Sequence, residues 1–269
     1  MRPLRILLCS ALLATQPALA ETVRVGGTGS ASPLMQELGV AYARQHPGST
    51  VQVMAPPPGT GGGVSMLVAG KLDLALAGRK LKPEELSQVG TVFPYASTPL
   101  VIAGRGQRKS GFTRDEVSDL YAGRLNRWDD AATIRLLMRS PYESDTLQLR
   151  ALSPAVNDAL RLAFDRPGMA YAENDIDAIN LLVRTTGSVG TTTLGLLRSV
   201  APSLQVYPLD GIKPTLATLA DGSYPLSKSI YIVAGRQPNE AARRFIAFLR
   251  TPQALDVLRR GDYLAFPWQ

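Results

Sequence analysis

The 269-residue sequence has almost no cysteine or histidine, and each shortage removes a class of function. It contains one cysteine, Cys9, and one histidine, His46. Zinc sites need sets of cysteine and histidine ligands, and a disulfide framework needs paired cysteines. His46 stands beside Pro47 at the expected end of a helix, so a Ser-His-Asp or Cys-His catalytic system would rest on one poorly placed residue. The sequence predicts no metal site, no catalytic residue and no enzyme activity.

Long apolar runs are missing after the first twenty residues. Residues 1–20 carry Arg2 and Arg5, then an apolar run, then Ala18-Leu19-Ala20, which is the pattern of a secretory signal with an A-x-A cleavage site. No later run approaches the ~20 apolar residues that span a bilayer. We expect cleavage after Ala20 and a soluble periplasmic product. Because Cys9 leaves with the signal, that product has no disulfide and depends on core burial for its stability.

An excess of charge of one sign is also nearly absent. The formal net charge is +7, and it falls to +5 when the two signal arginines are removed. The arginines are spread along the chain and do not form the stripe of a nucleic-acid surface. Adjacent carboxylates occur at 84–85 and 129–130, but neighbours point in different directions and are typical of solvated helix ends. We expect no nucleic-acid partner.

The sequence does contain a glycine-rich stretch around which the rest is organised. It runs Pro58-Gly59-Thr60-Gly61-Gly62-Gly63 and continues into apolar residues at helical spacing. Glycines let the backbone approach a ligand closely, and free N–H groups at a helix start attract anions. Thr60 can donate to an oxyanion or cap the helix. Two interpretations stay open at this point, an anion-binding loop and an ordinary glycine-rich connection; without a following lysine it is not a nucleotide P-loop.

Alternating elements surround this stretch. Strands are expected at 22–26, 50–54 and 72–77, with a helix over 33–44 between the first two and another after Gly63. This order implies right-handed crossovers and a mainly parallel sheet. Ligands bind beyond the carboxyl ends of such strands. Ser30, Thr60 and Arg79 are therefore expected to converge on one site.

The rest of the chain predicts a second region with its own elements. A helix should begin after Thr113, which forms a capping-box pattern with Glu116, and end at Gly123. We expect strands over 99–104, 204–208 and 229–234, a strand or turn over 187–190, and helices over 154–164, 175–184, from Asn239 onward and 252–260.

Several segments together resemble the periplasmic phosphate-binding proteins of ABC importers, within the wider class of two-lobed solute-binding proteins. The likeness covers most of the chain after the signal. Its most specific part is Tyr121-x-Gly123 followed by Trp128, which we interpret as a structural turn with Trp128 in the core. The other parts are Gly29-Ser30-Ala31-Ser32-Pro33-Leu34, Gly59-Thr60-Gly61-Gly62-Gly63 with residues 72–79, and Gly187-Ser188-Val189-Gly190.

The resemblance implies an α/β fold of two lobes, each a mainly parallel sheet flanked by helices, with the ligand held in the cleft between them. The first lobe would combine residues 21–97 with 228–269, and the second would be residues 98–227. Crossovers near 96–100 and 224–228 fit this division, because prolines 94, 99 and 225 suit stiff extended connections.

The resemblance also implies ligand-binding residues. In the family, phosphate is held by hydroxyls, by N–H groups at helix starts, by an arginine and by an aspartate that accepts a proton from the ligand. Arg79 matches an arginine that many relatives carry, although the serine before it in them is Gly78 here. The matching positions are Ser30 and Ala31, Thr60 and Gly61, Arg79, and in the second lobe Arg139, Ser144, Asp145 and Thr146.

Asp145 is a departure from the family, which has glycine between the serine and the threonine. Arg139 also stands one residue further from Ser144 than the family spacing. Two interpretations of Asp145 stay open: it accepts a hydrogen bond from a protonated oxyanion, or the ligand differs from phosphate. Arg139 and Asp145 would also suit a salt bridge between neighbours.

The resemblance implies a monomeric periplasmic protein that captures a small oxyanion, phosphate in first place, for the membrane subunits of an ABC importer, with no cofactor. The alternative keeps the fold and drops transport. It is an orphan binding, sensor or interaction protein with a different ligand, since fold does not fix function.

Overall fold

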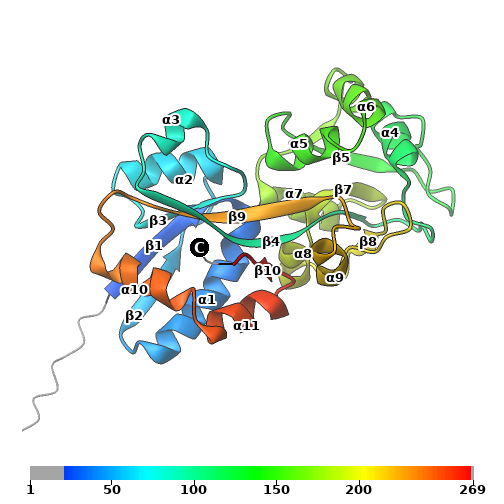
Figure 1. Cartoon of the computed structure of the whole chain (residues 1–269). Coiled ribbons are helices and arrows are strands. Elements are labelled where there is room, and N and C mark those ends of the chain that lie inside the picture. Colours follow the sequence, from blue (N-terminus) through cyan, green and yellow to red (C-terminus); the bar gives the residue numbers. More distant parts are fainter. Residues whose placement is uncertain (1–20, 268–269) are drawn as a thin grey trace, which may run out of the picture.

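The computed structural model describes residues 21–267, which form two lobes joined by two long strands (Figure 1). The predicted signal and its cleavage site at Ala20 lie outside the described residues. None of the helices within 21–267 is long and apolar enough to cross a membrane.

The first part of the chain alternates strands and helices as the sequence predicts. β1 pairs in parallel with both β2 and β3, so the expected parallel start of the sheet is confirmed. The elements are β1 (Glu21–Gly27), the 3-10 helix η1 (Gly29–Ala31), α1 (Ser32–Gln45), β2 (Ser49–Val53), α2 (Gly59–Val68), β3 (Leu74–Ala77) and α3 (Pro83–Leu86).

Two strands then connect the lobes. β4 (Thr91–Gly104) and β9 (Ser227–Ala234) run antiparallel to each other from one lobe toward the other, as Figure 1 shows. β9 also pairs antiparallel with β3, and the far half of β4 pairs antiparallel with β7. The sheets are therefore mixed, with parallel pairs inside each lobe and antiparallel pairs where the chain crosses over.

The middle of the chain builds the second lobe between these strands. Its elements are α4 (Arg114–Ala122), β5 (Arg135–Arg139), α5 (Ser144–Arg150), α6 (Pro154–Phe164), β6 (Ala170–Ala172), α7 (Asp175–Arg184), β7 (Ser188–Thr193), α8 (Leu194–Val200), β8 (Gln205–Tyr207) and α9 (Leu216–Ala220). After β9 the chain returns to the first lobe as α10 (Glu240–Phe248), α11 (Pro252–Arg260) and β10 (Leu264–Ala265).

The buried apolar side chains form separate cores, and each core lies within one lobe. One core packs α1, α10 and α11 on one face of the first sheet, and a smaller one packs α2 on the other face. Two further cores draw only on residues between Leu100 and Leu226. We propose on this basis that the lobes divide at the boundaries the sequence suggested, 21–97 with 228–269 and 98–227.

Local signals in the sequence predicted helix ends well. The Thr113 hydroxyl accepts the Glu116 N–H and Gly123 ends α4 in the left-handed conformation, while Asn239 caps α10. Trp128 is buried, so its expected place in the core is confirmed. One expectation was inaccurate: residues 59–63 are the first turns of α2 and not a loop before it. No element was predicted from the sequence at the positions of α3, β5, β6, α8, α9 or β10.

Candidate functional site

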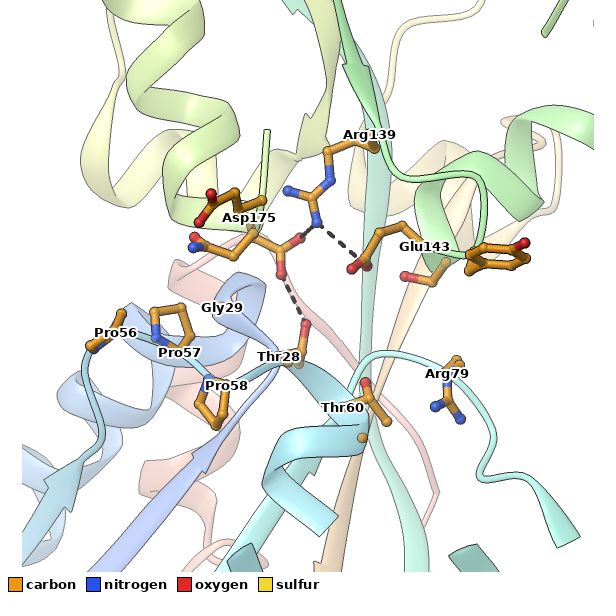
Figure 2. Close-up of a pocket in the computed structure, with 16 residues that line it drawn as sticks. Thr28, Gly29, Pro56, Pro57, Pro58, Thr60, Arg79, Arg139, Glu143 and Asp175 are labelled. Atoms are coloured by element: carbon orange, nitrogen blue, oxygen red, sulfur yellow. Dashed lines mark hydrogen bonds and ion pairs between the residues drawn. The ribbon is translucent and has the colours of Figure 1, made fainter. Parts of the chain in front are cut away.

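A cavity of about 450 Å³ lies between the two lobes, beyond the carboxyl ends of β1, β2 and β3. Figure 2 shows Thr28, Thr60 and Arg79 on one side of it and Arg139, Glu143 and Asp175 on the other. Its lining is completed by Gly29, Pro56, Pro57, Pro58, Gly59, Gly61, Tyr142, Ser144, Glu173 and Asn174. Such a volume is in the range of ligand pockets, about 300–1,000 Å³.

The start of α2 forms the first-lobe wall of the cavity. Its N-cap residue, Pro58, makes no side-chain cap, so the first N–H groups of the helix have no capping side chain. Gly63 permits this placement, because a Cβ there would lie 2.8 Å from the Gly27 Cα. The Thr60 hydroxyl accepts the Gly78 N–H at 3.0 Å, and its own proton remains available to a ligand.

Arg79 lies beside this helix start and is tied to α3. Its guanidinium donates to both Glu85 carboxylate oxygens, at 2.7 and 2.8 Å. The hydrogen bonds from Arg79 lower the pKa of Glu85 against the opposing effect of burial. Glu84 and Glu85 were predicted to be solvated helix-end carboxylates, but Glu85 instead holds Arg79 in place at the edge of the cavity.

Arg139 places a positive charge on the second-lobe side of the cavity. It is only 5% exposed, and its Nη2 lies 3.4 Å from a Glu143 oxygen and 3.7 Å from an Asp175 oxygen. Its Nε and Nη1 are buried and have no hydrogen-bond partner within residues 21–267. In Figure 2 it is Nη2 that points into the cavity, between Asp175 and Glu143.

A buried ion network lies under the cavity. Lys228 of β9 is 2% exposed, and its Nζ donates to Asp145 at 2.8 Å and to Asp175 at 2.7 Å. The other Asp175 oxygen accepts the Ser30 N–H at 3.0 Å and the Thr28 hydroxyl at 3.1 Å. Asp175, at the start of α7, therefore contacts both β9 and the loop after β1. This carboxylate connects the two lobes.

The charges in this network set the ionisation of Asp175 and Lys228. Burial by itself would raise the pKa of Asp175, but the positive charges of Lys228 and Arg139 outweigh it and hold that pKa well below its usual range. Burial likewise opposes the charged form of Lys228, and the two aspartates raise its pKa above the usual value. Both residues are charged at neutral pH.

Gly78 makes room for this network. A Cβ at position 78 would lie 2.9 Å from the Lys228 Cε and 2.9 Å from the Thr28 Oγ1, which is closer than Cβ atoms approach other heavy atoms. The resembled family has serine at this position. Here a side chain larger than that of glycine would collide with the Lys228 side chain.

The structure brings some of the predicted site residues to the cavity and places others beneath it. Thr60, Gly61, Arg79, Arg139 and Ser144 line the cavity. Ser30, Ala31, Asp145 and Thr146 are buried and do not line it. Asp145 pairs with Lys228, and the Thr146 hydroxyl donates to the Ser140 carbonyl at 2.8 Å. The binding roles of all nine stay predictions.

Sequence reasoning missed the residues that connect the lobes. Asp175 was predicted only as the first residue of a helix, and Lys228 only as the end of a crossover. Neither position carries a local motif, because their partners come from segments far apart in the chain. Glu143 lies inside the segment from Arg139 to Thr146, and its spacing of four residues from Arg139 was the one available signal for their ion pair.

Acid is expected to weaken the connection through Asp175. Because its pKa is lower in the folded than in the unfolded chain, this carboxylate stabilises the fold at pH values above about 4, and the stabilisation is lost as pH falls toward the folded pKa. Each unit of lowering corresponds to about 1.4 kcal/mol. Urea unfolding at pH 6, 4 and 3 should therefore show a steeper loss for the natural chain than for Asp175→Asn. Parallel losses would contradict the assignment.

The lobes, the crossover strands and the polar cavity between them define a two-lobed binding protein. The chain belongs to the PBP superfamily, since the sequence model of the PBP superfamily domain matches residues 14–253. This is a family of extracytoplasmic substrate-binding proteins, and the prediction that the chain is not an enzyme is thereby confirmed.

Individual relatives are distant but cover most of the chain. The phosphate-binding protein PstS of Staphylococcus haemolyticus is 22% identical over 90% of this chain and 80% of its own length. A phosphate ABC transporter substrate-binding protein of Clostridium perfringens, solved with bound phosphate, has a TM-score of 0.77 at 17% identity and covers 92% of this chain and 100% of its own. The periplasmic molybdate-binding protein of Azotobacter vinelandii has a TM-score of 0.66 at 16% identity, covering 91% and 100%. At these identities the structures show the fold alone.

Proposed function

We propose that this chain captures a small oxyanion, phosphate in first place, in the periplasm and delivers it as a monomer to the membrane subunits of an ABC importer. The observation that carries the proposal is the buried Arg139 guanidinium, which lines the cavity and points its Nη2 into it (Figure 2). Thr60, Arg79 and the uncapped start of α2 face it from the first lobe. Arginine, hydroxyl and helix N–H groups together are the donors that recognise oxyanions.

The names of the relatives support phosphate as the ligand in this proposal. The curated proteins that match over most of the chain carry the name phosphate-binding protein PstS. Phosphate is therefore the first ligand to test, and delivery to an importer follows from the same relationship.

A second candidate is a different ligand bound by the same fold. Glu143, Glu173 and Asp175 place three carboxylates along the cavity, and the Tyr142 ring beside them is 85% exposed. These groups favour a larger ligand that carries a positive or aromatic part besides its anionic group. An orphan sensor or interaction protein would suit such a ligand as well as a transporter.

Calorimetric titration separates these candidates. The chain without its first twenty residues would be freed of ligand by unfolding and refolding, then titrated with phosphate, sulfate, molybdate and tungstate at two pH values. One-to-one binding of phosphate alone supports the proposal. Absence of heat with all four anions would withdraw the oxyanion function and leave the second candidate.

Loss of the Thr60 hydroxyl is expected to weaken binding. Thr60→Val should reduce the affinity for phosphate by about 1–3 kcal/mol, because a hydrogen bond to a charged group is no longer made. The hydroxyl also accepts the Gly78 N–H, so Thr60→Ser is the matched control that keeps both bonds. Calorimetry measures affinity and thermal unfolding checks the fold. Equal affinities of the valine variant and the natural chain would remove Thr60 from the site.

A further inference from the structure

We propose that the Asp175 carboxylate permanently fills one anion subsite of the cleft, as a ligand tethered to the second lobe. An incoming oxyanion is then confined to the neighbouring part of the cavity, between Thr60, Arg79 and Arg139. This inference rests on the proposed function, because it concerns the placing of the anion in the same cavity.

The first support is the set of donors that surround this carboxylate. The Ser30 N–H and the Thr28 hydroxyl reach one of its oxygens from the first lobe, at 3.0 and 3.1 Å. The Lys228 ammonium lies 2.7 Å from the other oxygen, and Arg139 lies 3.7 Å from it. Figure 2 shows Asp175 between Arg139 and Thr28. A hydroxyl, a main-chain N–H, an ammonium and a guanidinium are the groups that would hold a free oxyanion.

The second support is that the surrounding residues fit the tethered carboxylate and not an empty subsite. Lys228 is buried and needs counterions, and Asp145 and Asp175 supply two. Gly78 leaves the space in which Lys228 and Thr28 lie. Gly78 and Asp145 are two of the positions where this chain departs from the resembled pattern. Both departures are accounted for by one arrangement, a lysine that binds the two aspartates.

A second anion cannot share these donors. An oxyanion at the Ser30 N–H would lie in contact with the Asp175 carboxylate, and two like charges at that distance repel strongly in a partly buried site. The donors that line the cavity next to Asp175 are Thr60 and Arg79 from the first lobe and Arg139 from the second. The ligand is therefore expected between these three residues.

Removing the carboxylate is expected to open the filled subsite. Asp175→Ala leaves Lys228, Arg139, Thr28 and the Ser30 N–H facing a vacancy. Phosphate should then bind about tenfold or more tightly than to the natural chain, as expected for one to two hydrogen bonds with charged groups. Acetate at 100 mM should raise the unfolding temperature of this variant by about 3 °C or more, and should leave the natural chain unchanged.

A matched control separates local occupancy from overall charge. Glu173→Ala removes a negative charge from the lining of the same cavity, at an exposed residue two positions away. Any gain in phosphate affinity should be smaller than in Asp175→Ala, and acetate should give no response, because Glu173 accepts no hydrogen bond from Ser30, Thr28 or Lys228. A gain as large in Glu173→Ala as in Asp175→Ala would overturn the proposal, because the effect would then be one of charge alone.

The outcomes for the two proposals differ. Phosphate binding to Asp175→Ala but not to the natural chain would support the tethered carboxylate and refute phosphate capture by the natural protein. Binding to the natural chain with equal or weaker binding to Asp175→Ala would support phosphate capture and overturn the tethered carboxylate. If Asp175→Ala is unfolded in dilute buffer, recovery of its circular dichroism by acetate and not by chloride supports the proposal. Failure of acetate to restore it overturns the proposal.

Discussion

Lys228→Met is expected to destabilise the protein by about 3–5 kcal/mol, the cost of leaving buried carboxylates without their counterion. Lys228 Nζ lies within 2.8 Å of oxygens from both Asp145 and Asp175, and all three side chains are less than a tenth exposed. Methionine keeps the length of the side chain and loses the charge. Asp145 would then keep no ion pair within residues 21–267, while Asp175 would keep only the longer contact with Arg139.

Neutralising the aspartates should recover most of that loss. The triple variant Lys228→Met, Asp145→Asn, Asp175→Asn removes the whole charged group, and such replacements are often neutral or stabilising. Lys71→Met at an exposed position is the control for a change from lysine to methionine. Urea unfolding at pH 7 measures each free energy. A difference below about 1 kcal/mol between Lys228→Met and the natural chain would show that this network contributes little to stability.

Arg139→Met should cause the largest loss of ligand affinity, about 2–5 kcal/mol, or roughly thirtyfold to several thousandfold. Arg139 is buried and lines the cavity, so methionine removes a charged donor from the second-lobe side of the site. Asp175 keeps its contact with Lys228, and the Glu143 side chain is 36% exposed to solvent, so the fold should survive the substitution.

Arg79→Met is the comparison on the opposite lobe. Its side chain is 24% exposed and already pairs with Glu85, so its loss should cost only about 1 kcal/mol of binding. Calorimetry with the oxyanion that binds the natural chain measures both variants, and thermal unfolding confirms that they fold. If Arg79→Met loses more affinity than Arg139→Met, the anion lies at the first lobe and the importance given to Arg139 is wrong.

Local chemistry in the sequence accounts for most of the fold. Helices with strong end signals, such as the one between Thr113 and Gly123, and the helices over 154–164, 175–184 and 252–260 lie where they were predicted. Short elements such as β6 and α9 have too few residues for a periodic pattern and were missed. The glycines at 59–63 suggested a loop, but Gly63 lies within a helix because that helix must approach β1 closely.

The candidate site was only partly predictable for a different reason. The glycine-rich stretch pointed to Thr60, and the end of a predicted strand, together with the family resemblance, pointed to Arg79. The surroundings of both residues are set by nearby sequence. The partners of Asp145 and Asp175 were not accessible in this way, because Lys228 lies on a crossover strand far along the chain. One interpretation of the sequence makes Asp145 a proton acceptor for the ligand. In the structure its carboxylate accepts a hydrogen bond from Lys228 instead. Ion pairs between distant segments leave no spacing in the sequence from which they can be read.

The first lobe is built from both ends of the chain, and this has a consequence for the order of folding. β3 pairs with β1 on one side, but its other neighbour is β9, which follows the entire second lobe in the sequence. A chain that emerges from its N-terminus can complete the cores between Leu100 and Leu226 from contiguous residues. Until β9 arrives, the apolar strand β3 has an open edge of the kind that pairs with other chains and aggregates. A newly made chain therefore carries an exposed strand edge in its first lobe until residues 227–234 pair with β3.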